Sequence, residues 1–313
     1  MPEAPSSGVR INIDDLVRLK ASAQGYSLLP RQPVHSILAG THASRLRGRG
    51  LSFEELRRYF PGDDVRTIDW HVTARTRKPH VRVYSEERDR PLLLIVDQRP
   101  TMFFGSRRAM KSVAAAEVAA LSAWRALAVG DRVGGLVFDG QELSEIEPHR
   151  SESRVLALFH AIVRMNQRLA PDSPAGTITL NQVLERAATV ARHDSLVCVI
   201  SDLSGADQET VRLMTRIQAH NDALLIFIHD PLEAELPQAG RLVMAQGERR
   251  LEVDTSTRKF RDDYAQEFEN RVTRLKSLSL KRAVPLLEIS TAEDVTSQVR
   301  RALGGAMQNR RRH

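Results

Sequence analysis

Short apolar runs alternate with amphipathic segments over the last two thirds of the chain. The runs read PLLLIVD, RVGGLVF, SLVCVISD and ALLIFIHD, and helical patterns start near Arg107, Ser153, Leu180 and Asp207. Continuous apolar runs of four to eight residues are typical of strands buried on both faces, as in parallel sheets with crossover helices. The pattern therefore predicts an α/β fold, a doubly wound and mostly parallel sheet with helices on both faces.

The clearest helical pattern runs from Arg107 to Val129. Its apolar stripe consists of Met110, Val113, Ala116, Ala120, Leu121, Trp124 and Leu127, which recur at the spacing of one helix face. Further on, GRLVMAQGERRLEVD predicts an antiparallel hairpin at the sheet edge, with its turn at Gln246 and Gly247. A long helix is expected from about Ser256, and the strand VPLLEIS with one more helix completes the sheet.

The first 90 residues have a different character. After a short helical pattern from Asn12 to Leu19, the chain is rich in Arg, Gly and Asp and has no clear period until the alternating strand HVRVYSEER. We therefore expect three parts: an irregular N-terminal lobe with a short edge strand over 1–90, the α/β domain over 91–305, and a basic tail over 306–313.

Composition limits the classes of protein that fit. Hydrophobic residues make up 42% and charged residues 27% of the 313 residues, as in ordinary globular proteins. No apolar run is long enough to span a membrane, the N-terminus lacks a secretory leader, and the single cysteine, Cys198, lies in an apolar run. These features predict a cytoplasmic protein without a membrane span.

A net charge of +7 and a pI near 10.0 raise the alternative of a nucleic-acid-binding protein. The basic residues are interspersed with acidic ones, as in RKFRDDYAQEFENRVTRLK, which is more typical of a solvated helix face than of a binding stripe. We therefore expect no nucleic-acid partner.

Polar side chains follow the predicted parallel strands, where ligands bind in open α/β sheets. Asp97 and Thr101 follow the first run, Asp202 and Ser204 follow the third, and Thr177 precedes a helix. Carboxylate and hydroxyl oxygens are the ligands that Mg²⁺ prefers. If these side chains converge, the edge forms either a magnesium site or a charged docking surface.

The spacing resembles the metal-ion-dependent adhesion site of von Willebrand A domains, to which Asp97, Thr101 and Asp202 correspond. Arg99 stands where that site has its middle serine, and a guanidinium cannot coordinate metal. Two positive centres 4 Å apart repel by roughly 4 kcal/mol at an effective dielectric constant near 20. Either Arg99 turns away, or it replaces the ion by pairing with Asp97 or Asp202. The cofactor is thus none or Mg²⁺, and the second-loop threonine, Thr177 among the candidates, stays open.

A dense charged segment, GRGLSFEELRRYFPGDDVRTIDWHVTAR, precedes the α/β domain. Its carboxylates Asp63, Asp64 and Asp69 allow the alternative of a metal-dependent hydrolase or nuclease. Interleaved arginines favour a structural ion-pair network instead, because their planar forks bind carboxylates bidentately. The expected clamps are Arg58, Arg66, Arg75 and Arg82, and Trp70 and Tyr59 are expected to anchor the lobe.

This segment resembles the signature of the bacterial family called domain of unknown function 58, which has the form GxGxEFxxxRxYxPGDDxRxIDWxxxAR. Ser52 and Phe53 stand where the family commonly has Glu-Phe, so one carboxylate of the signature is missing. The resemblance implies a von Willebrand A-like fold, no catalytic activity, and a partnership with a MoxR-type AAA+ ATPase that acts on other proteins. Together with the strand ends, it predicts a non-enzymatic adaptor that docks through the rim of Asp97, Thr101 and Asp202. The client protein is not indicated.

Overall fold

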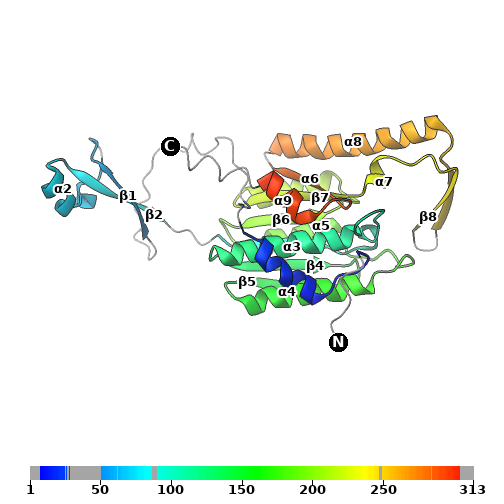
Figure 1. The fold of residues 1–313 in the computed structure, drawn as a ribbon, viewed down its shortest axis with the longest axis horizontal. Coiled ribbons are helices and arrows are strands. Elements are labelled where there is room, and N and C mark those ends of the chain that lie inside the picture. The colour runs from blue at the N-terminus through cyan, green and yellow to red at the C-terminus, as the bar shows by residue number, and fades with distance from the viewer. Residues whose placement is uncertain are drawn as a thin grey trace. The chain divides into compact units, whose positions relative to one another are not determined.

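A six-stranded sheet forms the centre of the larger part of the chain (Figure 1). The strand order is β10 (Leu286–Ser290), β7 (Asp222–His229), β6 (Leu196–Ser201), β3 (Leu92–Asp97), β4 (Val133–Phe138) and β5 (Leu143–His149). All neighbours are parallel except β4 and β5. The predicted α/β fold with a mostly parallel sheet is therefore confirmed.

In this computed structural model the described residues are 8–24, 26, 28, 51–61, 63–86, 90–246, 249–282 and 284–303. They belong to two compact units. The first, called the α/β unit, contains Met1–Arg31 and Arg90–His313, and the second, called the signature unit, contains Gln32–Asp89. The predicted basic tail over 306–313 lies outside the described residues.

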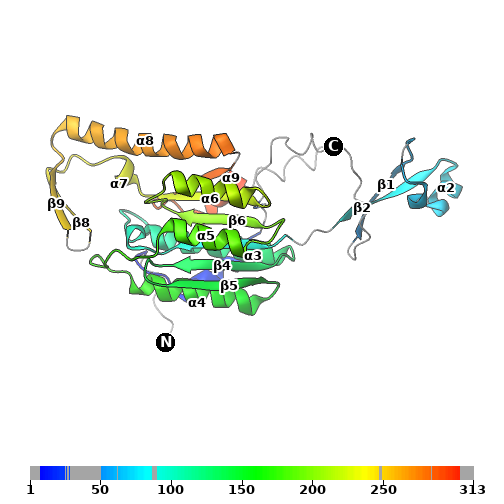
Figure 2. The ribbon, with the colours of Figure 1, turned by 180° about the vertical axis from the view of Figure 1, so that it is seen from behind.

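Helices cover both faces of the sheet because successive strand residues point to opposite sides. Leu92, Leu94 and Val96 of β3 pack with α3 (Lys111–Ala128), α4 (Glu152–Arg168) and α9 (Val295–Leu303). Leu93 and Ile95 pack with α5 (Leu180–Val190), α6 (Gln208–Gln218) and part of α8 (Arg258–Arg282). Figure 1 shows α3 and α4 in front of the sheet, and Figure 2 shows α5 and α6 on its other side.

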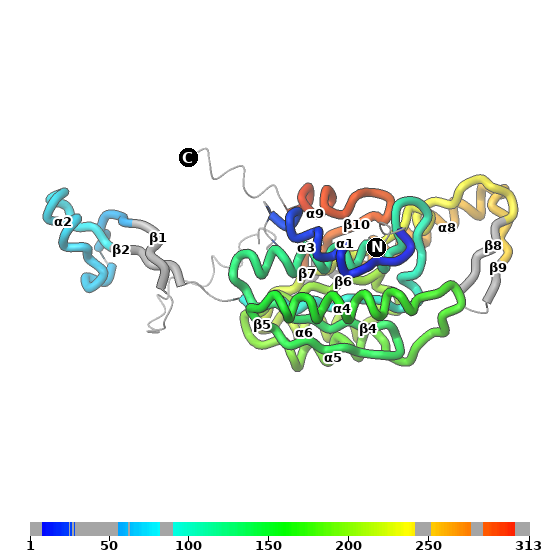
Figure 3. The backbone as a smooth tube through the Cα atoms, turned by 60° about the horizontal axis from the view of Figure 1, so that its bottom comes forward, coloured from blue at the N-terminus to red at the C-terminus, as the bar shows by residue number. Residues whose placement is uncertain are grey.

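The N-terminal segment belongs to the α/β unit, which corrects the predicted lobe boundary. Its helix α1 (Ile13–Arg18) lies beside α3 and α4 (Figure 3). Trp124 Nε1 donates to the carbonyl of Leu16 at 2.9 Å, and the Tyr26 hydroxyl donates to the carbonyl of Leu121 at 2.9 Å. Leu16 and Tyr26 are fully buried. These contacts join residues about a hundred positions apart, so local sequence could not reveal them.

Two antiparallel pairs lie outside the main sheet. β8 (Arg241–Gln246) and β9 (Arg249–Asp254) form the predicted hairpin, but as a separate two-stranded sheet. The expectation that the hairpin lies at the edge of the main sheet is wrong, because β10 and β5 are the edges. Gly247, placed in the predicted turn, lies outside the described residues.

The signature unit contains regular structure where an irregular lobe was expected. β1 (Leu51–Arg58) and β2 (His80–Glu86) form an antiparallel ribbon, and the short helix α2 (Trp70–Thr76) lies between them in sequence. The strand predicted at HVRVYSEER therefore pairs with β1 and not with the main sheet. Among all described residues, no helix is both long and apolar enough to cross a membrane.

Candidate functional site

Three buried aspartates lie at the carboxyl ends of neighbouring parallel strands. Asp97 ends β3, Asp202 follows β6, and Asp230 follows β7, and all three side chains are buried. Parallel strands finish at one edge of their sheet, so the sequence could place Asp97 and Asp202 there. The structure brings these two together with Arg99, as predicted for the rim; Asp230 was not predicted.

Arg99 points into this edge and pairs with Asp97. Its Nε lies 3.0 and 3.1 Å from the two carboxylate oxygens, and its Nη2 lies 2.7 Å from Oδ2 and 3.1 Å from the carbonyl of Ser204. The Ser201 hydroxyl donates to the same Oδ2 at 2.6 Å, and the guanidinium lies over the ring of Phe138. Burial alone would lower the pKa of Arg99, but the charge of Asp97 raises it. Arg99 therefore stays charged and neutralises Asp97.

Lys111, at the start of α3, neutralises the second aspartate. Its Nζ lies 2.9 Å from Oδ2 of Asp202 and 2.6 Å from Oε1 of Glu233, and only 2% of the residue is exposed. Glu233 belongs to the one-turn helix α7 (Pro231–Ala234). Burial would lower the pKa of Lys111, but the two carboxylates raise it above its ordinary value.

Lys111 was not among the predicted site residues, although its position in the sequence contained one signal. A cation at the first position of a helix faces the positive end of the helix dipole. Lys111 occupies that position. Such a placement is unfavourable unless carboxylates lie nearby.

The two predicted threonines have different environments. The hydroxyl of Thr101 is buried and has no hydrogen-bond partner among the described residues. Thr177 is exposed, and the N–H of the next residue, Ile178, donates to the carbonyl of Gly140 at 2.8 Å. The backbone of Gly176 lies against the same carbonyl, too close for a Cβ on Gly176, and a Cβ added to Gly140 would lie 3.8 Å from Cγ of Arg99. The loop of Thr177 therefore lies close to Arg99 through Gly140. Among the described residues, no hydrogen bond joins Thr177 itself to the rim.

The edge does not fit a divalent cation. Arg99 already contacts both oxygens of Asp97, and Nη2 is 4.0 Å from Oδ1 of Asp202, whose other oxygen binds Lys111. Within the described part of the chain, no three His, Cys, Asp or Glu side chains are grouped so as to hold a metal. Asp230 is bound by neutral donors, the Ser106 N–H and the Thr291 hydroxyl among them.

Asp63, Asp64 and Asp69, the predicted carboxylates of the signature unit, stabilise local backbone. Asp63 pairs bidentately with Arg57 at 2.7 and 2.9 Å, which lowers its pKa, and accepts from the N–H of Phe60. Asp64 accepts from the N–H of Arg66, and Asp69 caps α2 by accepting from the N–H of Val72. Each carboxylate thus holds a turn or a helix start, a role that needs no metal.

Other predictions for this unit need correction. The described arginine that clamps Asp63 is Arg57, whereas the side chains of Arg58, Arg66 and Arg75 form no ion pair with a described residue. The side chain of Arg82 lies outside the described residues. Trp70 does not anchor the lobe, because 69% of it is exposed.

Exposed apolar side chains gather in the same stretch. Phe60 is 63%, Val65 58% and Trp70 69% exposed. The N–H of Tyr59 donates to the carbonyl of Pro79 at 2.9 Å, and that of Asp69 donates to the carbonyl of His80 at 2.8 Å. Phe60 and Trp70, which directly follow Tyr59 and Asp69, therefore lie at the same end of the ribbon formed by β1 and β2. We call Phe60, Val65 and Trp70 the aromatic end.

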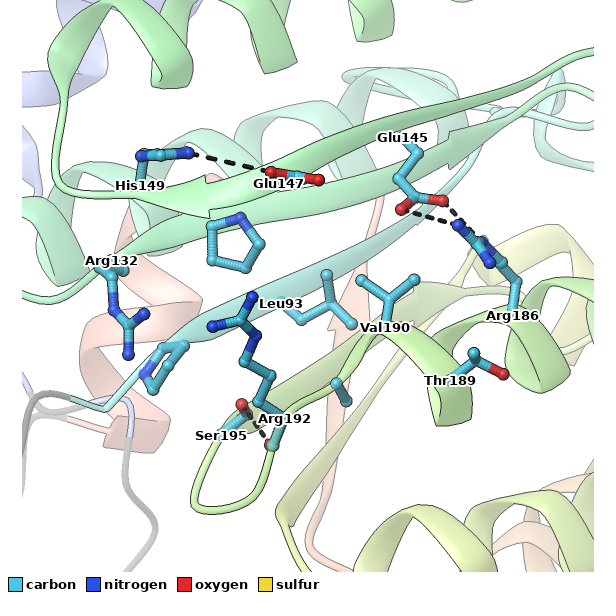
Figure 4. Close-up of a pocket in the computed structure, with 13 residues that line it drawn as sticks. Leu93, Arg132, Glu145, Glu147, His149, Arg186, Thr189, Val190, Arg192 and Ser195 are labelled. Atoms are coloured by element: carbon cyan, nitrogen blue, oxygen red, sulfur yellow. Dashed lines mark hydrogen bonds and ion pairs between the residues drawn. The ribbon is translucent and has the colours of Figure 1, made fainter.

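A cavity of about 480 Å³ lies at the opposite, amino-terminal edge of the main sheet (Figure 4). Within it, Arg186 pairs bidentately with Glu145, and Arg192 forms no ion pair with a described residue. The hydroxyl of Ser195 donates to the carbonyl of Arg192 at 2.7 Å, so this serine has no activating base. The geometry of Ser195 therefore does not indicate a catalytic serine.

Fold and site together define an α/β protein whose carboxyl edge holds two internal cations paired with its carboxylates, with a second unit that exposes aromatic residues. The chain belongs to the family described as Protein of unknown function DUF58, whose sequence model matches residues 55–274. This result confirms the family predicted from the signature.

Relatives are found both among sequences and among solved structures. Uncharacterized proteins of Mycobacterium tuberculosis and Mycobacterium bovis are 29% identical over 314 residues, with 96% of each chain covered. Similar solved structures include BatB from Bacteroides thetaiotaomicron, with 11% identity and a TM-score of 0.38, covering 67% of this chain and 94% of that chain. The SpRpn10 VWA domain has 12% identity and a TM-score of 0.39, covering 70% of this chain and 98% of that chain.

Proposed function

We propose that this chain is a cytoplasmic, non-enzymatic interaction protein that works with a MoxR-type AAA+ ATPase on client proteins. Membership of the DUF58 family supports the interaction role, and the ATPase partner is what the resemblance of the signature implies. Asp97, Asp202 and Asp69 are occupied by ion pairs and a helix cap, and this supports a role for these carboxylates other than catalysis.

The docking surface in this proposal is the aromatic end of the signature unit, in place of the rim. Asp97 and Asp202 are buried and already paired, so a partner cannot reach their charges. By contrast, Trp70 is 69% exposed. Tryptophan carries an unusually large share of binding energy at protein interfaces, and large exposed apolar groups are typical of interaction sites. This exposed tryptophan is the observation that carries the proposal.

The charges around the aromatic end fit an acidic partner surface. Arg58, Arg66 and Arg75 are exposed and form no ion pair with a described residue. The nearby carboxylates of Asp63 and Asp69 are occupied by Arg57 and by the start of α2. Positive side chains around an apolar centre favour partners that present aspartate or glutamate beside apolar residues.

Affinity measurements with the purified MoxR-type ATPase of the same organism test the proposal. Trp70→Ala should weaken binding by about 30-fold, the effect of losing about 2 kcal/mol at a central interface residue. Phe260→Ala is the matched control, because Phe260 is an exposed aromatic residue on α8 of the other unit, and its affinity should stay within about twofold of the wild type. Wild-type affinity in a folded variant that carries both Trp70→Ala and Phe60→Ala would refute this docking surface.

Intrinsic fluorescence provides a second readout. The chain has two tryptophans, Trp70, which is exposed, and Trp124, which is buried. Binding at the aromatic end should protect Trp70 from a soluble quencher and leave the emission of Trp124 unchanged. Complex formation without any protection of Trp70 would place the contact elsewhere.

A further inference from the structure

We infer that Arg99 and Lys111 are built-in replacements for a divalent cation at the carboxyl edge, and that removal of the Arg99 guanidinium would create a site for Mg²⁺ or Mn²⁺. The inference concerns the edge alone and does not depend on where a partner docks.

The first observation is the position of Nη2 of Arg99. It lies 2.7 Å from Oδ2 of Asp97, 3.1 Å from the carbonyl oxygen of Ser204 and 4.0 Å from Oδ1 of Asp202. Three oxygens from two strand ends thus surround one positively charged nitrogen. Oxygen atoms are the ligands that a hard cation takes, and Mg²⁺ usually keeps several waters beside a few protein oxygens, so the guanidinium stands where such an ion could sit.

The second observation is that both cations are held in place by neighbouring elements. The guanidinium of Arg99 lies over the ring of Phe138 on β4. Nζ of Lys111 bridges Asp202 and Glu233, so it links the end of β6 to α7. A bound ion is replaced here by two side chains that cannot dissociate, and the edge keeps its shape at any concentration of divalent ions.

The third observation is the residual charge. Asp97, Asp202, Asp230 and Glu233 supply four negative charges, against two positive charges from Arg99 and Lys111. Without the guanidinium, Asp97 would lose the cation that pairs with it, and Oδ1 of Asp202 and the Ser204 carbonyl would face the same space, while Lys111 would still pair with Oδ2 of Asp202. Thr101, two residues after Arg99, has a buried hydroxyl without a described hydrogen-bond partner and adds an oxygen in the same loop. Oxygen donors with excess negative charge select hard divalent cations.

Thermal unfolding and calorimetric titration of the full-length protein with Mg²⁺ and Mn²⁺ test the inference. The wild type should show no saturable heat and no change in Tm. Arg99→Ser should bind the ion, and its Tm should rise by about 5–10 °C once the ion exceeds its Kd by 100-fold. Arg99→Lys, which keeps a cation, should respond like the wild type. Arg99→Ser combined with Asp202→Asn should lose the response.

Each outcome has a consequence. Saturable binding of Mg²⁺ by the wild type would overturn the inference, because the edge would then hold an ion beside Arg99. A folded Arg99→Ser variant that binds neither ion would overturn it as well. If Arg99→Ser is unfolded without metal, folding upon addition of Mg²⁺ supports the inference. Failure to fold when Mg²⁺ is present in at least 10-fold molar excess over the protein counts against it.

Discussion

Replacing Lys111 by methionine is the sharpest test of how the carboxyl edge is stabilised. Methionine has nearly the same length but no charge, so the change removes the cation that bridges Asp202 and Glu233 and leaves only Arg99, 4.0 Å away, near Asp202. Lys111 is 2% exposed, and its two contacts measure 2.9 and 2.6 Å. Water therefore cannot replace the lost ammonium without opening the edge.

The expected cost is about 3–5 kcal/mol of the free energy of unfolding, the usual effect of removing one partner from a buried ion pair. For a unit of this size, that loss corresponds to a fall in Tm of roughly 6–20 °C. The matched control is Lys276→Met, which breaks the exposed pair between Lys276 and Glu288. An exposed pair contributes at most about 1 kcal/mol, so the control should lie close to the wild type.

The pH dependence separates a charge effect from a packing effect. In the wild type, burial would raise the pKa of Asp202, but the charge of Lys111 and its hydrogen bond lower it below the ordinary value. The stability from this carboxylate is therefore fully present above its unfolded pKa, about 3.9, and is lost as the pH falls through the lower folded pKa. In Lys111→Met only burial and weaker partners remain, so Asp202 takes up its proton at higher pH.

The difference in unfolding free energy between wild type and Lys111→Met should consequently shrink as the pH falls from 8 towards 5. Urea titrations at several pH values measure it directly. A loss below about 1 kcal/mol at pH 8 would contradict the ion-pair argument, and a large loss that does not vary with pH would assign the effect to packing.

Three further predictions concern other parts of the molecule. Tyr26→Phe should cost about 0.5–1.5 kcal/mol in urea unfolding, because it removes a buried hydrogen bond to the carbonyl of Leu121, which keeps its donor within α3; an unchanged stability would show that this hydrogen bond does not stabilise the α/β unit. Asp69→Ala should lower the stability of the signature unit by about 0.5–2 kcal/mol, and Asp69→Asn, which can still cap α2, should retain most of it. Burial raises the pKa of Cys198 to about 12, so at pH 8 its thiol should react with a thiol reagent only after denaturation, and rapid reaction of the native protein would refute its placement.

The sequence predicted every strand that is buried on both faces, and it also predicted β2, β8, β9 and β10; it missed β1 and β5. β3, β4, β6 and β7 are continuous apolar runs, and each was expected. β5 reads LSEIEPH, with charges and a proline, because an edge strand contacts solvent and is protected by such residues. β1 reads LSFEELRR and pairs only with β2, so no apolar run marks it. The apolar pattern of a sequence therefore reports the burial of a segment more directly than it reports strand structure.

Prediction of the site was limited by long-range partners. The topology rule located Asp97 and Asp202 at one edge, because both follow apolar runs. The partner of Asp202 is Lys111, 91 positions earlier, and Glu233 completes the bridge from a helix of four residues. Neither has a local pattern that identifies it. In the signature unit, the mixture of aspartate and arginine suggested many ion pairs, whereas the described aspartates mainly hold backbone N–H groups.

The same carboxylates that could be mistaken for a catalytic cluster explain why Trp70 is exposed. Asp64 and Asp69 cap consecutive short helices, and a capped helix start fixes the direction in which the next side chain leaves the backbone. Trp70 is the first residue of α2, directly after its cap. The described part of the signature unit, a two-stranded ribbon with short helical turns, has little core in which to bury an indole, so the capped backbone at this point holds the ring in solvent. Rigid presentation reduces the entropy lost on binding, and a capped helix start followed by an exposed tryptophan is therefore better suited to contact a partner than to stabilise the fold.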